Sequence, residues 1–219
     1  MNTDLISYYK KRAKEYENIY LKPERQNDLL RAAMILQDIF TNKKIFEIAC
    51  GTGYWTEKIS QKALSIFATD INDAVLEIAK NKEYAKSNVT FGLADFYNCQ
   101  LSEHYEGLFG GFIWSHILVQ DLDSFLVKIN SFVSPEGQVV FIDNNFKGGS
   151  NHPITMTDAE GNTFQIRKLE DETDHLVLKN FSTKDYILKK LEGFAKNIKF
   201  YDLEYYWILT YKTLNTNNT

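Results

Sequence analysis

Cysteine is scarce in this 219-residue chain, which contains only Cys50 and Cys99. Two cysteines are too few for a disulfide framework, so we expect free thiols and a reducing compartment, the cytoplasm. No apolar run reaches the roughly 18 residues that a membrane-spanning helix needs, so we expect no membrane partner. The N-terminal segment 1–20 also lacks the apolar core and small-residue cleavage site of a secretory signal.

The chain has no excess of positive charge. Its 25 Lys and Arg residues stand against 29 Asp and Glu residues, giving a net charge of −4. Proteins that bind nucleic acid normally carry a basic face, so we expect no nucleic-acid partner. Hydrophobic residues make up 44 % and charged residues 25 %, which is ordinary for a globular protein and excludes disordered and fibrous classes.

Hydrophobic periodicity predicts an α/β protein. Two helices open the chain. The second is expected at about 24–40, and one side of the first carries Tyr9, Arg12, Ala13, Tyr16 and Tyr20. Short apolar strands then alternate with helices, which predicts a parallel sheet with helices on both faces. The expected strands lie at 44–49, 64–69, 89–93, 111–114 and 139–142. One expected helix follows the glycine turn after the first strand and ends at about 60, and the others run from about 74 to 84 and from 121 to 132.

The alternation ends after Asp143. Short strands are expected at 163–166 and 176–178, then a helix near 184–194 and a strand-rich run from 198 to 214. We interpret residues 1–219 as one domain with a β-rich insertion at about 146–180.

The segment Glu47–Gly53 stands where the first strand meets the next helix. Glycines at 51 and 53 allow a sharp turn and a close approach to a ligand, and the carboxyl ends of parallel strands are where ligands bind. Asp70 ends the second strand about 20 residues later, where a carboxylate can accept from two ribose hydroxyls. The pattern predicts a site for a nucleoside cofactor.

The glycine pattern does not fit a dinucleotide site well. A dinucleotide fingerprint has a third small residue where this chain has Thr56, and a phosphate loop of the G-x-x-x-x-G-K-[ST] type is absent. A nicotinamide-dependent oxidoreductase therefore stays as an alternative, because it uses the same kind of glycine turn.

The ordered motifs resemble those of class I S-adenosylmethionine (SAM) methyltransferases. Glu47–Gly53 resembles their motif I, Thr69-Asp70-Ile71 their motif II, and Ala94-Asp95-Phe96 the acidic–apolar pair after the third strand. The run 198–213 resembles their closing hairpin, and the first helix resembles the lid of the ubiquinone/menaquinone-type branch. The resemblance implies a Rossmann-like, doubly wound, seven-stranded, mostly parallel sheet with a C-terminal antiparallel hairpin and a helical lid at 1–40.

The resemblance also implies roles for individual residues. Gly51 and Gly53, with Glu47 and Ala49 beside them, would hold the methionyl end of SAM. Asp70 would bind the ribose, with Ile71 against the adenine. The remaining expected cofactor contacts are Asp95 to the adenine amino group, Phe96 along the ring, Ser115 near the reacting end, and Arg12 from the lid.

His116 is the catalytic candidate. Methyl transfer requires a nucleophile held about 3 Å from the methyl carbon, and an oxygen or carbon nucleophile often needs a base. His116 follows the expected fourth strand on the substrate side, and an imidazole pKa near 6.5 suits a base at neutral pH. A hydrogen-bonded structural histidine is the alternative interpretation.

The expected acceptor is a small molecule. The Asn/Asp-Pro-Pro-aromatic motif of amino-group methyltransferases and the Pro-Cys nucleophile of cytosine methyltransferases are both absent. Asp143-Asn144 resembles part of a magnesium site in catechol-type enzymes, but Ser115-His116 stands where a further Asp is needed, so we expect no metal. The sequence predicts SAM-dependent methyl transfer, with S-adenosylhomocysteine (SAH) as product, by a monomer or homodimer. A non-catalytic SAM-binding protein is a further alternative.

Overall fold

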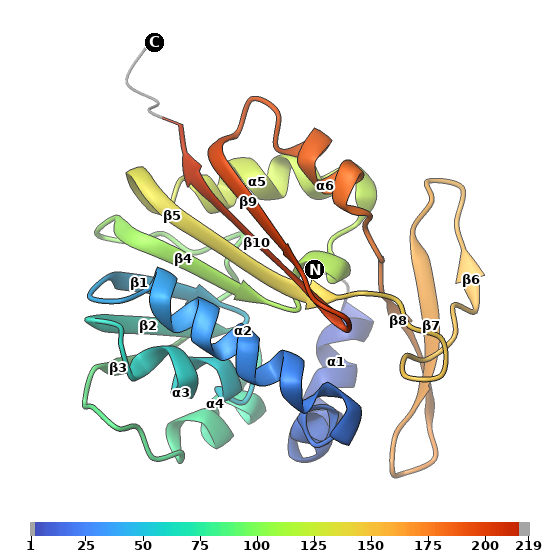
Figure 1. The fold of residues 1–219 in the computed structure, drawn as a ribbon. Helices are drawn as coiled ribbons and strands as arrows, with labels where there is room; N and C mark the ends of the chain where they lie inside the picture. Colours follow the sequence, from blue (N-terminus) through green and yellow to red (C-terminus); the bar gives the residue numbers. More distant parts are fainter. Residues whose placement is uncertain (1–2, 215–219) are drawn as a thin grey trace.

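A seven-stranded sheet forms the centre of the computed structural model, which describes the backbone of residues 3–214 and the side chains of residues 7–214. The five strands from β3 to β5 are parallel, and β10 runs antiparallel to both β5 and β9. This confirms the expected α/β sheet with a C-terminal antiparallel hairpin (Figure 1). In spatial order the strands are β3 (Val89–Leu93), β2 (Ser65–Asp70), β1 (Lys44–Ile48), β4 (Tyr105–Gly111), β5 (Val133–Asn144), β10 (Tyr206–Thr213) and β9 (Ala195–Asp202).

Successive side chains of the central strands point to opposite faces of the sheet and enter two different cores. In β5, Val140 and Ile142 belong to one core, whereas Val139 and Phe141 belong to the other. All four are fully buried. Strands covered on both faces appear in the sequence as continuous apolar runs, which is why periodicity alone located β1, β2 and the latter part of β5.

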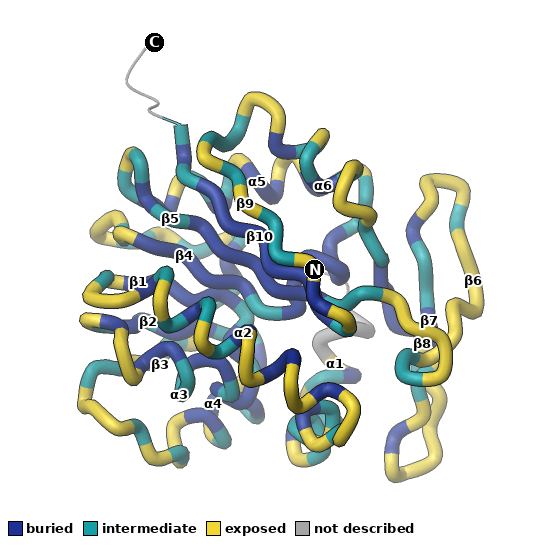
Figure 2. Tube along the Cα trace, in the orientation of Figure 1, coloured by how far each residue is buried: buried dark blue, intermediate teal, exposed yellow. Residues whose placement is uncertain are grey.

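Helices cover both faces of the sheet. The first core is closed by α2 (Gln26–Ile39), α3 (Tyr54–Ser60) and α4 (Asp73–Lys80), and the second by α5 (Leu122–Asn130) and α6 (Lys184–Lys190). Figure 2 shows the sheet as the most buried part of the chain, with exposed turns at its rim.

The fourth strand was placed wrongly at 111–114. β4 ends at Gly111, and the backbone turns at Phe112, whose φ of +58° is outside the extended region. Glycines inside β4 hid the strand, because they resemble turn residues in the sequence. A Cβ at Gly107 would lie 2.9 Å from the Phe40 ring, so this glycine makes room for a packed aromatic side chain.

The N-terminal segment is helical, but only its first part is an α-helix. α1 (Thr3–Arg12) passes into a 3-10 helix, η1 (Ala13–Tyr20), and a short 3-10 turn, η2 (Pro23–Arg25), precedes α2. Later helices are also shorter than expected: α4 ends at Lys80 and α6 at Lys190. Asn72 caps α4, because its side chain accepts from the Ala74 N–H.

The segment after β5 forms a separate three-stranded sheet of β6 (Met156–Thr157), β7 (Thr163–Lys168) and β8 (Asp174–Leu178). The expected strands at 163–166 and 176–178 are β7 and β8, and β6 is additional. This sheet stands beside the central one and next to α1 (Figure 1). No helix among residues 3–214 is long and apolar enough to cross a membrane.

Candidate functional site

A cavity of about 700 Å³ opens at the carboxyl ends of β1 to β4. The chain runs from β1 outward to β3 and then returns to β4 on the other side of β1, so the cavity lies at the point where strand order reverses. Ligands of open parallel sheets bind at this point. The residues lining the cavity are Tyr9, Tyr16, Ala49, Gly51, Asp70, Ile71, Asn72, Val75, Ala94, Phe96, Gly111, Phe112, Ile113 and His116.

The bend after β1 forms the floor of this cavity. Gly51 has φ +56° and Gly53 has φ +78°, a region that favours glycine. A Cβ at Gly51 would lie 3.8 Å from the Tyr16 ring, across the cavity, whereas a Cβ at Gly53 would lie 2.7 Å from the Tyr84 hydroxyl. Gly51 thus leaves room for a ligand, and Gly53 allows the bend to pack against α4.

Asp70 joins the bend to the end of β2. Its carboxylate accepts from the Gly51 N–H at 2.9 Å and from the Asn72 N–H at 2.9 Å. Burial raises the pKa of Asp70 to about 6, although these N–H groups oppose the rise. The residue lines the cavity, so its carboxylate is placed to accept hydroxyl groups of a bound ligand.

Asp95 and Phe96 follow β3 but face different surroundings. The Phe96 side chain is buried and lines the cavity. The Asp95 carboxylate accepts from the Tyr97 N–H at 3.0 Å and from the Asn98 amide at 2.7 Å, and it does not line the cavity. Its expected contact with an adenine amino group stays a prediction.

The N-terminal helices close one side of the cavity. Tyr9 and Tyr16 line it from α1 and η1, with their rings 5.8 Å apart. Glu17 fixes η1 to the bend, because its carboxylate accepts from the Thr52 hydroxyl at 2.7 Å and pairs with Lys82. Arg12 does not line this cavity. Its guanidinium lies over the Tyr16 ring, 5.6 Å from the centroid.

His116 lies on the cavity wall with both ring nitrogens engaged. Nδ1 is 2.6 Å from the Leu178 carbonyl oxygen, which can only accept, so Nδ1 carries the proton. Nε2 then accepts from the Tyr9 hydroxyl at 2.8 Å. Burial, together with the charges of Lys179 and Arg167, holds the pKa of His116 well below its usual value. His116 is therefore neutral at pH 7.

A buried ion pair lies behind this wall. Lys179 Nζ is 2.9 Å from Asp143 Oδ1 and donates to the Ser115 hydroxyl at 2.6 Å. Asp143 also accepts from the Ser115 N–H. Burial alone would raise the pKa of Asp143, but Lys179 and this N–H hold it below its usual value. Lys179 was not anticipated from the sequence, although it directly follows a strand, as ligand-binding residues often do.

Glu47 lies under the bend, away from the cavity. Its side chain is 2 % exposed, and one carboxylate oxygen has no hydrogen-bond partner among the described residues. Burial raises the pKa of Glu47 to about 8, against the lowering effect of Thr56. Glu47 is thus mostly protonated at pH 7.

A second cavity, of about 630 Å³, adjoins the first. Tyr9, Tyr16, Phe112 and His116 line both. The second cavity extends toward the start of α2, the loop after β5 and the strand β7. The residues lining only this part are Arg12, Ile19, Lys22, Arg25, Asn144, Ser150, Asn151, His152, Gln165, Arg167, Lys179 and Tyr206.

The expected site residues fall into three groups. Those on the wall of the first cavity are Ala49, Gly51, Asp70, Ile71, Phe96 and His116. Arg12 lines the second cavity, whereas Glu47, Gly53, Asp95 and Ser115 line neither cavity. Among residues 3–214, no group of three or more His, Cys, Asp or Glu side chains is placed to hold a metal ion.

The strand order, the glycine bend and the strand-end carboxylate together resemble the arrangement of class I methyltransferases. Comparison with known proteins agrees, because residues 45–137 match a family model described as "Methyltransferase domain". The match covers the segment from β1 to the first part of β5, which contains the glycine bend and Asp70.

Among curated relatives, malonyl-[acyl-carrier protein] O-methyltransferase 2 of Ilyobacter polytropus is 28 % identical over 137 residues, covering 61 % of this chain and 51 % of that protein. Malonyl-[acyl-carrier protein] O-methyltransferase of Bacillus cereus is 35 % identical over 83 residues, covering 36 % of this chain and 30 % of that protein. The chain matches about half the length of the first and less of the second.

Among solved structures, the DhpI–SAH complex superposes with a TM-score of 0.80 at 22 % identity, covering 97 % of this chain and 96 % of that one. The 1,6-didemethyltoxoflavin-N1-methyltransferase of Burkholderia thailandensis superposes with a TM-score of 0.65 at 12 % identity, covering 97 % and 88 %. At these identities the likeness concerns the fold.

Proposed function

We propose that this protein transfers the methyl group of SAM to a small-molecule acceptor. The observation that carries the proposal is that the glycine bend and Asp70 face one cavity at the carboxyl ends of the parallel strands. A second cavity meets the first at His116 and Tyr9 and offers space for the acceptor.

The residues of the first cavity fit SAM. Asp70 would accept the ribose hydroxyls, and Ile71 and Phe96 would contact the adenine. The missing side chain at Gly51 leaves the space that the methionyl end requires. When bound, SAM supplies a methyl group activated on a sulfonium. Glu47, Gly53 and Asp95 do not line the first cavity, and they would act by shaping the loops that follow β1 and β3.

The chain's own residues position the acceptor and exclude water. Tyr9 and Tyr16 cover the cavity from the N-terminal helices, which we propose to act as a lid, as in the ubiquinone/menaquinone-type branch that the sequence resembles. His116 is neutral and its Nε2 carries a lone pair, so it can accept a hydrogen bond from Tyr9 or from an acceptor hydroxyl. Its low pKa makes it a weak base, which favours a positioning role over proton abstraction.

Two features bear on the setting of the reaction. Cys50 and Cys99 are free thiols, which supports a reducing compartment such as the cytoplasm. The second cavity is walled by the lid and β7, which favours a small acceptor over a nucleic acid.

Calorimetric titration with SAM and SAH tests the proposal. We expect both to bind, and we expect the Asp70→Ala variant to lose about 1–3 kcal/mol of binding free energy because a hydroxyl partner is removed. Asp38→Ala, on the exposed side of α2, is the matched control and should bind like the wild type.

NAD is titrated in parallel. Binding of NAD in preference to SAH by the folded protein would overturn the proposal in favour of an oxidoreductase. Transfer of a labelled methyl group from SAM to members of an acceptor panel then separates an enzyme from a non-catalytic SAM-binding protein.

A further inference from the structure

The second cavity is rich in positive charge, although the chain as a whole is acidic. Five Lys and Arg side chains line it, and no Asp or Glu side chain does. The entire chain has 25 Lys and Arg against 29 Asp and Glu residues. The concentration of cations is therefore local to this cavity. They are Arg12, Lys22, Arg25, Arg167 and Lys179.

Most of these cations lack a carboxylate partner. Within residues 7–214, Lys179 pairs with Asp143, but no ion pair involves Lys22, Arg25 or Arg167. Glu24 lies between Lys22 and Arg25 in the sequence. It is exposed, accepts from the Ser150 hydroxyl and does not line the cavity. Burying cations together without counter-charges is unfavourable, so a ligand that brings negative charge is favoured here.

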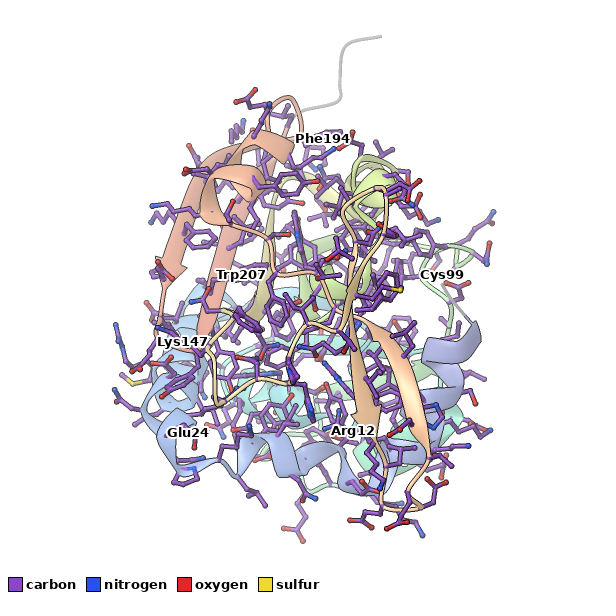
Figure 3. All side chains as sticks on the ribbon, turned by 90° about the vertical axis from the view of Figure 1, so that its right-hand side faces the viewer. Arg12, Glu24, Cys99, Lys147, Phe194 and Trp207 are labelled. Carbon is purple, nitrogen blue, oxygen red and sulfur yellow. The ribbon has the colours of Figure 1, made fainter. Side chains whose placement is uncertain are left out.

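Neutral groups hold two of these cations in place. Arg25 is 5 % exposed, and its Nη2 donates to the Ser150 hydroxyl at 2.8 Å and to the Ser150 carbonyl at 3.1 Å. Lys22 donates to the same carbonyl at 2.6 Å. The loop after β5 thus fixes both cations without cancelling their charge (Figure 3, where Glu24 marks η2 and Lys147 this loop).

Arg167 is fixed in the same way from β7. Its Nη2 donates to the Gln165 Oε1 at 2.9 Å, and the Gln165 amide donates to the His152 carbonyl at 2.6 Å. Burial lowers the pKa of His152, and the charges of Arg167, Arg12 and Lys22 lower it further. The His152 imidazole therefore lies in the positive electrostatic potential of these cations.

These cationic side chains lie close to the place proposed for the methyl acceptor. The charged cavity meets the first cavity at His116 and Tyr9, where the acceptor must stand if the proposed function holds. Planar guanidinium groups bind oxyanions through two parallel hydrogen bonds, and a second negative charge lets one group satisfy several cations. A doubly charged oxyanion fits Lys22, Arg25 and Arg167 better than a neutral or singly charged group does.

We infer that the methyl acceptor is a small molecule that carries a doubly charged oxyanion group, bound by Lys22, Arg25 and Arg167. This inference rests on the proposed function for the identity of the ligand as acceptor. The binding of the anion is a separate property and is tested separately.

Calorimetry on the SAH-saturated protein tests the inference, with inorganic phosphate, malonate and acetate as probes. We expect phosphate or malonate to bind at least tenfold more tightly than acetate. Arg167→Gln and Arg25→Gln should each weaken that binding at least tenfold. Arg31→Gln, an exposed arginine on α2, the helix that directly follows Arg25, is the matched control and should leave it unchanged.

A second readout uses the wild-type protein alone, in case a variant does not fold. The pKa of the His152 imidazole, followed by NMR, should rise when the dianion binds, because the anion offsets the neighbouring cations. If SAH binds but phosphate and malonate bind no better than acetate, or leave the pKa of His152 unchanged, the inference is overturned and the proposed function stands. If SAH itself does not bind, the proposed function fails instead.

Discussion

Two glycines of one bend have different tasks at the residue scale. Both have positive φ, so alanine at either position carries a backbone cost of about 1 kcal/mol. At Gly53 the new Cβ would also meet the Tyr84 hydroxyl at 2.7 Å, whereas at Gly51 it would point into the cavity toward Tyr16. Packing depends on Gly53, and space for the ligand depends on Gly51.

We therefore expect Gly53→Ala to lower the free energy of unfolding by about 2–3 kcal/mol, and Gly51→Ala by only about 1 kcal/mol. The loss of SAH affinity relative to the loss of stability should nevertheless be larger for Gly51→Ala than for Gly53→Ala. Urea unfolding and calorimetry on both variants measure the two effects. Equal loss of stability and of SAH affinity in the two variants would contradict this division.

Asp70 predicts a pH dependence of cofactor binding. Burial raises its pKa to about 6 in the free protein, and bound hydroxyls would favour the charged carboxylate and lower that pKa. The bound state then holds fewer protons than the free state, so affinity falls as the pH drops through 6. We expect SAH affinity to be constant above pH 7 and to fall by up to about tenfold per pH unit below 6.

Calorimetry between pH 5 and 8 measures this dependence, and Asp70→Asn serves as the comparison because it cannot titrate. Its weaker affinity should stay flat across the range. A wild-type affinity that is independent of pH would show that Asp70 does not accept from the ligand in its charged form.

At the scale of elements, the Lys179–Asp143 pair joins the end of β8 to the end of β5. Both side chains are almost fully buried, at 4 % and 1 % exposure. Removing one partner of a buried pair leaves an uncompensated charge and typically costs about 3–5 kcal/mol. The small sheet is thus attached to the central one by charge as well as by the backbone hydrogen bond from the Asn180 N–H to the Ser115 carbonyl.

We expect Lys179→Met to lower the free energy of unfolding by about 3 kcal/mol or more, and Asp143→Asn in the same protein to restore part of that loss. Lys190→Met breaks the more exposed pair with Asp123 and should cost less than about 1 kcal/mol. Urea unfolding of the four proteins tests this. Similar losses for Lys179→Met and Lys190→Met would refute the role given to the buried pair.

For the whole molecule, the sequence predicted those features that depend on local pattern. Continuous apolar runs located strands such as β5, and the glycine bend with Asp70 located the cofactor cavity. Strand β4 was displaced because Gly107 and its other glycines serve packing rather than turning. The local sequence does not show that the Phe40 ring, from a distant part of the chain, packs against Gly107.

The charged cavity escaped prediction for a different reason. Arg25 comes from η2, directly before α2, and Arg167 and Lys179 come from the segment that forms the small sheet. They meet only when that sheet stands beside the lid, so no local spacing in the sequence signals the cluster. The position of Lys179 directly after β8 was the one available sign.

The most direct test of the account is a crystal structure of the protein with SAH bound. We predict the ribose hydroxyls on Asp70, the adenine between Ile71 and Phe96, and the sulfur directed toward the junction of the two cavities at His116. SAH bound at another place, or held without any contact to Asp70 and the bend at Gly51, would contradict the central claim.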